Sequence, residues 1–172
     1  LLLSTTSALI PKLDKADQSL IATSVKSKLW KTGEMKLLQL NKAPAQVMLV
    51  DIKDITERKF GLMIRQFTRV AKSEGAKCAG VYLEDFEREN ISTETGVAAI
   101  AEHATLAHFD FSENFKTPPK EGWKHIEEIK LFTYHDAKKI EEAIAKGKTI
   151  GESINLCRTL ANYPPGDMTP SA

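Results

Sequence analysis

The chain has 172 residues, of which 42% are hydrophobic and 27% are charged, and its formal net charge is +1. This length is enough for one domain with a substantial core, and the composition is that of an ordinary globular protein. The near-zero net charge gives no general attraction to nucleic acid or to an anionic membrane, and no run approaches the roughly 18 apolar residues of a membrane-spanning helix. We therefore expect no membrane partner and disfavour a nucleic-acid partner.

The first residues indicate a strand rather than an export signal. Residues 1–10 lack a basic start, and four hydroxyl residues interrupt their apolar stretch. The chain begins with leucine inside a predicted strand at 1–3, so we interpret both ends of the chain as cuts in a longer polypeptide. A first helix is predicted from Asp14 to Lys28.

Two short apolar runs, at 36–40 and 47–52, predict strands. The link between them is too short for a crossover helix, so the two strands should pair antiparallel if they are neighbours. Asp54 to Glu57 then has the spacing of a capping box with Asp54 as the cap, and Gly75 is expected to end the helix that follows. Its predicted buried face consists of Phe60, Met63, Ile64, Phe67, Val70 and Ala71.

The middle of the chain predicts a strand, a loop and a third helix. Residues 78–83 are typical of a buried strand, and the charged residues 84–90 are typical of a loop. Ser92 or Thr93 is placed to cap the helix, whose small apolar face favours close packing on a sheet. That face consists of Val97, Ile100, Ala101, Ala104 and Ala107.

One long helix dominates the end of the chain. It follows an irregular segment at 109–122 and a predicted strand at 129–134, and Asp136 is placed to cap it. Gly147 and Gly151 lie one turn apart on its small and apolar face. Because glycine costs about 1 kcal/mol inside a helix, the pair predicts that something packs closely against the backbone there. The rest of the face is Ile140, Ala143, Ile144, Ile150, Ile154, Cys157 and Ala161.

The order of these elements predicts an α/β fold. Helices between strands imply right-handed parallel crossovers, whereas the one short link implies an antiparallel pair. We therefore predict a mixed, mostly parallel sheet with helices on both faces, ending in a long C-terminal helix. No internal repeat or low-complexity tract is present.

Sequence motifs of catalysis and ligand binding are absent. There is no phosphate-binding glycine motif and no G-x-S-x-G. His103 and His108 lie about 140° apart around a helix, and His125 and His135 belong to no motif. The acidic run at 84–89 lacks the glycine and the terminal glutamate of a calcium loop. We predict no catalytic, cofactor-binding or metal-binding residue in this chain.

The cysteines and the scattered lysines have ordinary structural interpretations. Cys78 and Cys157 have no CxxC partner, and two buried reduced thiols are favoured over a disulfide. Lysines near Phe115 and Trp123 have the composition of a nucleic-acid contact, but a solvated face is favoured at this net charge. The lysines concerned are Lys36, Lys42, Lys116, Lys120 and Lys124.

A sixteen-residue stretch near the C-terminus carries a resemblance to a known family. Residues 155–162 read Asn-Leu-Cys-Arg-Thr-Leu-Ala-Asn, and Tyr163, which precedes a proline, is expected to leave the helix. Pro164-Pro165 and Thr169-Pro170 follow. The stretch resembles the junction of the leucyl aminopeptidase family, in which Asn-Leu-x-Arg-x-Leu-x-Asn, a Pro-Pro pair and a Thr-Pro mark the helix that joins an N-terminal domain to the catalytic domain.

The resemblance implies that this chain is the front part of a cytoplasmic metallo-aminopeptidase. Residues 1–135 would form an N-terminal α/β domain similar to macro domains, and 136–172 the connecting helix and Pro-rich junction. The parent enzyme would release N-terminal amino acids from peptides with two divalent metals, Zn or Mn, and assemble as a hexamer. The family's metal-ligand motifs follow the junction and are missing here, so no catalytic residue is carried over. The chain's own role would be structural, with its catalytic domain and further copies as partners.

Two alternatives stay open. A free-standing macro-like module for ADP-ribose or a related nucleotide would need a glycine-rich loop and an asparagine-rich strand end, and the sequence has neither. A DNA-binding accessory role occurs in some bacterial members of the family, but the near-neutral charge argues against it here.

Overall fold

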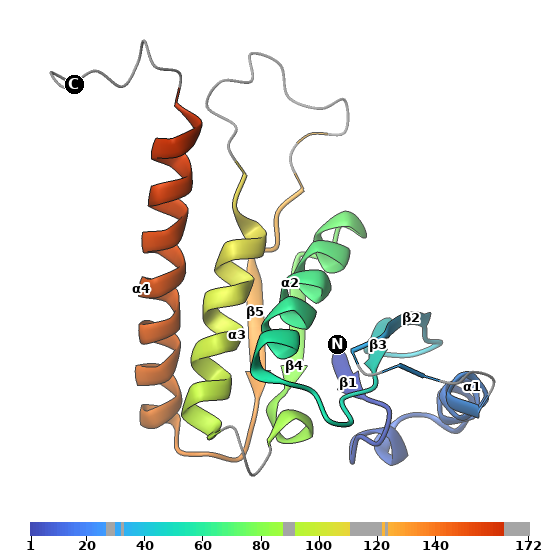
Figure 1. Cartoon of the computed structure of the whole chain (residues 1–172). Coiled ribbons are helices and arrows are strands. Elements are labelled where there is room, and N and C mark those ends of the chain that lie inside the picture. Colours follow the sequence, from blue (N-terminus) through green and yellow to red (C-terminus); the bar gives the residue numbers. More distant parts are fainter. Residues whose placement is uncertain (27–29, 32, 88–91, 111–121, 123, 164–172) are drawn as a thin grey trace, which may run out of the picture.

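The computed structural model describes residues 1–26, 30–31, 33–87, 92–110, 122 and 124–163. In this part of the chain, strands and helices alternate around a single sheet (Figure 1). The elements are β1 (Leu2–Ser4), α1 (Lys15–Lys26), β2 (Met35–Gln39), β3 (Gln46–Val50), α2 (Glu57–Ser73), β4 (Cys78–Tyr82), α3 (Thr93–His108), β5 (Glu128–Phe132) and α4 (Ala137–Asn162), with 3-10 turns at Ile10–Lys12 and Leu83–Phe86.

The sheet is mixed and mostly parallel, as predicted. The order of its strands is β2-β3-β1-β4-β5. β2 and β3 pair antiparallel, with Leu37 opposite Met48, because the short link between them cannot cross over the sheet. β1 runs parallel to both β3 and β4, and β4 runs parallel to β5.

Helices cover both faces of the sheet, which confirms the predicted layers. Successive side chains of a strand point to opposite faces, so Leu2 and Leu3 of β1 enter different clusters. Leu2 packs in the cluster built with α2, α3 and the start of α4, and Leu3 packs with Ile21 of α1. The central strands are therefore buried on both sides, as parallel strands usually are.

The start of α2 differs from its prediction. Thr56, not Asp54, is the cap, and its hydroxyl oxygen accepts a hydrogen bond from the backbone N–H of Lys59 at 3.3 Å. Asp54 instead has a φ of 52° in the turn before the helix, and Ile55 is drawn into the core. Because Ile55 is buried, the helix begins two residues later than predicted, and Thr56 rather than Asp54 is placed to accept from its first N–H groups. At the other end, Gly75 terminates α2 with a φ of 74°, as expected.

Two further interpretations from the sequence need correction. The predicted charged loop after β4 begins as a 3-10 turn whose Phe86 is buried against Phe60, with ring centroids 5.8 Å apart. Cys78 and Cys157 are free thiols, but both are exposed rather than buried. Cys78 begins a strand, and Cys157 lies on the outer side of α4. Residues 88–90 of the predicted charged loop and residues 111–121 of the predicted irregular segment lie outside the described residues.

Two helix caps and one helix end agree with the sequence. Ser92 caps α3 by accepting from the N–H of Thr95, and Asp136 caps α4 by accepting from the N–H of Lys139. Tyr163 leaves the helix with an extended backbone, as expected of a residue before proline. None of the helices that the structure describes combines the length and the apolar character required to cross a membrane.

Candidate docking surface on the last helix

The first half of α4 is fixed against α3 by its two glycines. A Cβ at Gly147 would overlap the carbonyl oxygen of Ala98 and come within 2.8 Å of its carbonyl carbon. A Cβ at Gly151 would lie 2.8 Å from the Cβ of Thr105 and 3.0 Å from the carbonyl oxygen of Glu102. The two helices lie side by side along most of α3 (Figure 1). The predicted close approach at the glycine pair is therefore confirmed, and the approaching group is the backbone of α3.

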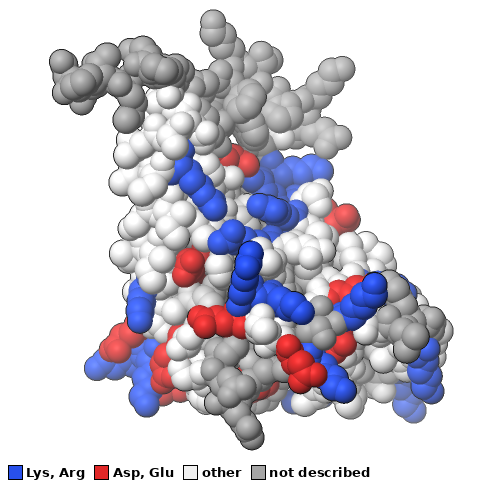
Figure 2. Space-filling view, in the orientation of Figure 1, with Lys and Arg blue, Asp and Glu red and all other residues white. Residues whose placement is uncertain are grey.

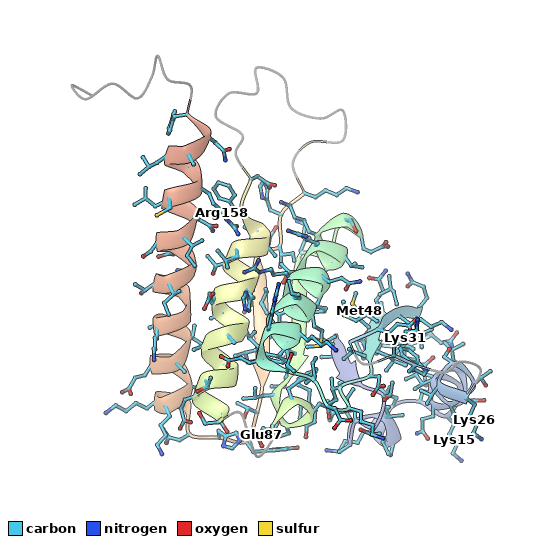
Figure 3. The ribbon with its side chains drawn as sticks, viewed as in Figure 1. Lys15, Lys26, Lys31, Met48, Glu87 and Arg158 are labelled. Carbon is cyan, nitrogen blue, oxygen red and sulfur yellow. The ribbon has the colours of Figure 1, made fainter. Side chains whose placement is uncertain are left out.

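The polar residues of the junction motif hold the second half of α4 to the end of α3. Asn155 donates from Nδ2 to the carbonyl oxygen of Thr105 at 3.0 Å, and Arg158 donates from Nη1 to that of Leu106 at 3.1 Å. Figure 3 shows Arg158 between α4 and this end of α3, where its guanidinium lies 5.9 Å from the ring centroid of Phe109. Carbonyls in the last turn of a helix lack partners within that helix, so these donors satisfy them. The junction motif includes Asn155 and Arg158, but the sequence did not predict that they bond to the end of α3.

Several apolar side chains in the second half of α4 are exposed. We call the residues Ile150, Ile154, Leu156, Cys157 and Leu160 the distal face. Leu156 is 60% exposed and Leu160 43%. At 100° per residue, these side chains cover an arc of about 160° around the helix. Large apolar side chains that stay exposed together are typical of interaction sites.

The apolar face that the sequence predicted for α4 is buried only in its first half. Ile140, Ala143, Gly147 and Gly151 are buried, whereas Ile150, Ile154, Cys157 and Ala161 are exposed. The physical reason is the length of the neighbour. α3 has 16 residues and α4 has 26, and the last turn of α3 already lies beside Asn155. Within the part of the chain that is described, no element covers the helix beyond that point.

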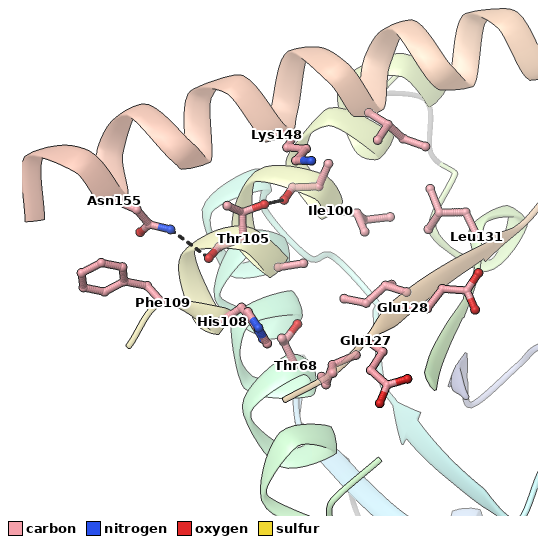
Figure 4. Close-up of a pocket in the computed structure, with 15 residues that line it drawn as sticks. Thr68, Ile100, Thr105, His108, Phe109, Glu127, Glu128, Leu131, Lys148 and Asn155 are labelled. Carbon is pink, nitrogen blue, oxygen red and sulfur yellow. Dashed lines mark hydrogen bonds between the residues drawn. The ribbon is translucent and has the colours of Figure 1, made fainter. Parts of the chain in front are cut away.

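A hollow of about 640 Å³ lies between α3, α4 and β5 (Figure 4). Apolar side chains such as Ile100 and Leu131 line it, together with Thr68, Thr105 and His108. Both threonine hydroxyls donate to carbonyl oxygens of their own helices, at 2.9 Å for Thr68 and 2.8 Å for Thr105. Neither is hydrogen-bonded to a base, so the geometry of nucleophilic catalysis is missing here.

The histidines lie in three separate places. His103 accepts a hydrogen bond at Nδ1 from Nε of Arg65 at 3.0 Å, and burial, followed by the Arg65 charge, lowers its pKa. His108 lies 5.5 Å from His125 between ring centroids, and burial, followed by the Lys72 charge, lowers the pKa of His108. His135 forms a contact with Glu87 through Nε2. Among the residues that the structure describes, no group of three or more His, Cys, Asp or Glu is placed to hold a metal.

Two carboxylates occupy the carboxyl ends of the central strands. Asp85 accepts from the backbone N–H of Ser4 at 2.8 Å, and burial raises the pKa of this carboxyl group. Glu84 accepts from the N–H of Tyr134 at 2.6 Å. In open α/β sheets, this edge is where ligands usually bind. Acidic side chains there oppose the binding of a phosphate-bearing ligand.

The lysines that were candidates for a nucleic-acid contact do not form one patch in the described residues. Lys36 lies 3.4 Å from the hydroxyl of Ser24, and Lys42 pairs with Asp14 at 2.8 Å, both at the β2 side of the sheet. Lys124 lies at the opposite side of the sheet, before β5. Phe115, Lys116, Lys120 and Trp123 lie outside the described residues, as do Pro164-Pro165 and Thr169-Pro170 of the junction.

Comparison with known proteins finds aminopeptidases. No family model matches the chain. A probable cytosol aminopeptidase of Dechloromonas aromatica is 26% identical over 168 residues, which are 92% of this chain and 34% of that protein. One from Alkalilimnicola ehrlichii is 28% identical over 148 residues, 82% of this chain and 30% of that protein. One from Roseiflexus castenholzii is 37% identical over 81 residues, 45% of this chain and 16% of that protein.

Solved structures share the fold of this chain. A tomato leucine aminopeptidase mutant has a TM-score of 0.74 at 22% identity, covering 96% of this chain and 33% of that one. The bottromycin maturation enzyme BotP in complex with Mn has a TM-score of 0.71 at 18% identity, covering 99% of this chain and 33% of that one. The chain thus spans about a third of the proteins that it matches along most of its length. These relatives confirm the resemblance to the leucyl aminopeptidase family that the junction motif predicted.

Proposed function

We propose that this chain is the N-terminal, non-catalytic part of a leucyl aminopeptidase. The parent enzyme would be a cytoplasmic hydrolase that releases N-terminal amino acids from peptides with two divalent metal ions, zinc or manganese. The aminopeptidase relatives and the fraction of their length that the chain spans support this proposal. The metals and the residues that bind them would belong to the rest of the protein, so this chain would contribute no catalytic, cofactor-binding or metal-binding side chain.

The chain's own role would be to hold the catalytic part in place. Residues 1–135 would form the macro-like N-terminal domain, and 136–172 the connection to the catalytic domain. The observation that carries this role is that α4 extends beyond α3. Gly147 and Asn155 hold it to α3, and the apolar side chains of its second half form the exposed distal face. A rigid helix with an exposed apolar side is suited to packing against a second folded body.

The catalytic domain is the partner that best fits the distal face. The face lies in the last turns of α4, next to the junction that would lead into that domain. Fully burying a leucine side chain contributes about 1.5–3 kcal/mol, so Leu156 and Leu160 alone would stabilise the contact considerably. The same contact would fix the orientation of the N-terminal domain in a hexamer.

The test changes the distal face in the full-length protein. Leu156→Glu and Leu160→Glu together should lower the assembled mass in multi-angle light scattering and reduce aminopeptidase activity, because two charges would face an apolar partner. Leu62→Glu is the matched control, since Leu62 is also an exposed leucine, 52% accessible, but lies on α2. Normal mass and activity in the double variant would contradict the role of the distal face.

The alternative of a free-standing nucleotide or ADP-ribose module is less well supported. Its ligand would bind at the carboxyl ends of the parallel strands. Glu84 and Asp85 occupy that edge, and Asp85 already accepts the backbone N–H of Ser4. A DNA-binding accessory role has the near-neutral net charge against it.

A further inference from the structure

A second hollow, of about 570 Å³, lies where the C-terminal ends of α2 and α3 meet α4. Among the residues that the structure describes, its charged lining consists of Arg69, Lys72, Lys124 and Arg158, with Asp110 as the single carboxylate. Four cations thus face one anion in a chain whose total net charge is only +1. Figure 2 shows lysine and arginine side chains gathered on this face between α2 and α4. Among the described residues, positive side chains are therefore gathered at this place.

Most of these cations are held in position by neighbours. Arg158 is bonded to the end of α3, and Lys124 donates to the carbonyl oxygen of Ser73 at 3.0 Å. Lys72 pairs with Asp110, and its side chain is only 17% exposed. Groups that are already ordered lose little conformational freedom when a ligand binds, which favours affinity.

Stabilisation of helix ends accounts for only part of this charge. Lys124 and Arg158 each donate to a carbonyl in the last turn of a helix, where a cation is favourable. Each helix end carries a charge of about −0.5, so the two ends together offset about one of the cations. Asp110 offsets another. Among the described residues, the two helix ends and Asp110 together therefore offset about two of the four positive charges in the lining.

The pKa of His108 is consistent with this local field. Its ring is not in the charged lining of the hollow, yet after burial the Lys72 charge is the next cause that lowers its pKa. The pKa of His108 is thus sensitive to the charge of the neighbouring hollow.

We propose that this hollow binds a small multivalent oxyanion, a molecule that carries phosphate or carboxylate groups. Arginine presents a planar fork of N–H donors that matches both groups, and Arg69 supplies one such fork. Arg158, whose Nη1 is already bonded to Leu106 and Asn155, adds its charge. The volume is in the range of about 300–1,000 Å³ that is usual for small-ligand sites. The site lies beside the N-terminal ends of β4 and β5, at the opposite edge of the sheet from Glu84 and Asp85. It is independent of the proposed structural role.

The experiment is a calorimetric titration of the chain, at low ionic strength, with pyrophosphate and separately with citrate. We expect saturable binding of at least one of them with a Kd of about 0.1–1 mM, weakened at least about fivefold by Arg69→Gln. Arg58→Gln is the matched control, because it removes the same charge from the same helix at an exposed position outside the hollow. It should change the Kd by less than about twofold.

The two ligands separate the chemical sources of the anion. Binding of pyrophosphate alone identifies phosphate groups, binding of citrate alone identifies carboxylates, and both with the same dependence on Arg69 support the shared site. No saturable heat up to about 10 mM of either ligand would overturn the proposal. Equal weakening by Arg58→Gln and Arg69→Gln would also overturn it, since the attraction would then be diffuse. Binding of duplex DNA without binding of either small anion would replace it with a nucleic-acid surface.

Discussion

His103 is the clearest single residue whose protonation should affect the fold. It lies between α2 and α3, where Nδ1 accepts the hydrogen bond from Arg65 and the ring fills the space above Gly61. A proton on Nδ1 would remove that acceptor and place a second positive charge beside the guanidinium. Burial and Arg65 therefore lower the pKa of His103 in the folded state.

The sign of the pH dependence follows from this direction. The folded state favours neutral His103, so the free energy of unfolding should be highest above the ordinary histidine pKa of about 6.5 and fall as the pH drops through it. The decline should level off below the lowered pKa of the folded state. Thermal unfolding at pH 7.5 and pH 5.0 measures the slope.

A variant isolates the contribution of His103 from that of other groups. His103→Gln keeps an acceptor for Arg65 but cannot be protonated, so its melting temperature should fall less between pH 7.5 and pH 5.0 than that of the wild type. A slope that His103→Gln leaves unchanged would rule out this residue as a cause.

At the residue scale, the sequence predicted conformational roles better than contacts. Gly75 and Ser92 follow from local rules on helix ends, which need no tertiary information. Asp54 was wrong because burial of Ile55 moved the helix start, and burial depends on the whole fold. The role of Arg158 could not be predicted either, because its acceptor lies 52 residues away in the chain.

At the scale of elements, the lack of a Cβ at Gly147 determines how closely α3 and α4 pack. In an exposed helix, glycine to alanine stabilises by about 1 kcal/mol. At Gly147 we predict the opposite sign, because the new Cβ would overlap the carbonyl of Ala98, which belongs to a backbone that cannot rotate away. Gly147→Ala should lower the free energy of unfolding by about 1–3 kcal/mol, measured by denaturant titration.

Ser153→Ala is the control for this prediction. Ser153 lies exposed in the same helix, and its hydroxyl donates only to the carbonyl oxygen of Thr149. The substitution should therefore change stability by no more than about 0.5 kcal/mol. If Gly147→Ala were as stable as the wild type or more so, the two helices would be farther apart than the structure shows.

The sequence predicted the elements well and the extent of their burial less well. The periodicity of α4 marks a face, and the glycine pair marks where another backbone approaches. Periodicity does not reveal where the neighbouring helix ends, and that end is what leaves Ile154 and Cys157 exposed. The second hollow was missed for a similar reason, since its cations come from α2, α4 and the segment before β5.

On the scale of the whole molecule, the structure has a closed part, in which apolar side chains are buried, and an open part, in which they are exposed. The sheet with its two buried clusters is closed, and the short link between β2 and β3 explains why these two strands pair antiparallel. The open part is the distal face of α4, which in our proposal packs against a catalytic domain. The sequence predicted this function from the junction motif rather than from the fold, because one fold serves many functions.

The central claim is that the chemistry of the proposed aminopeptidase does not belong to this chain. The most direct test incubates the purified chain with leucine amide in the presence of Zn²⁺ or Mn²⁺ and measures the release of free leucine. We predict no release above that of the metal ion alone, because the described residues provide no metal-holding group. Metal-dependent turnover at a rate typical of enzymes, about 1 s⁻¹ or more, that persists after further purification would contradict the claim.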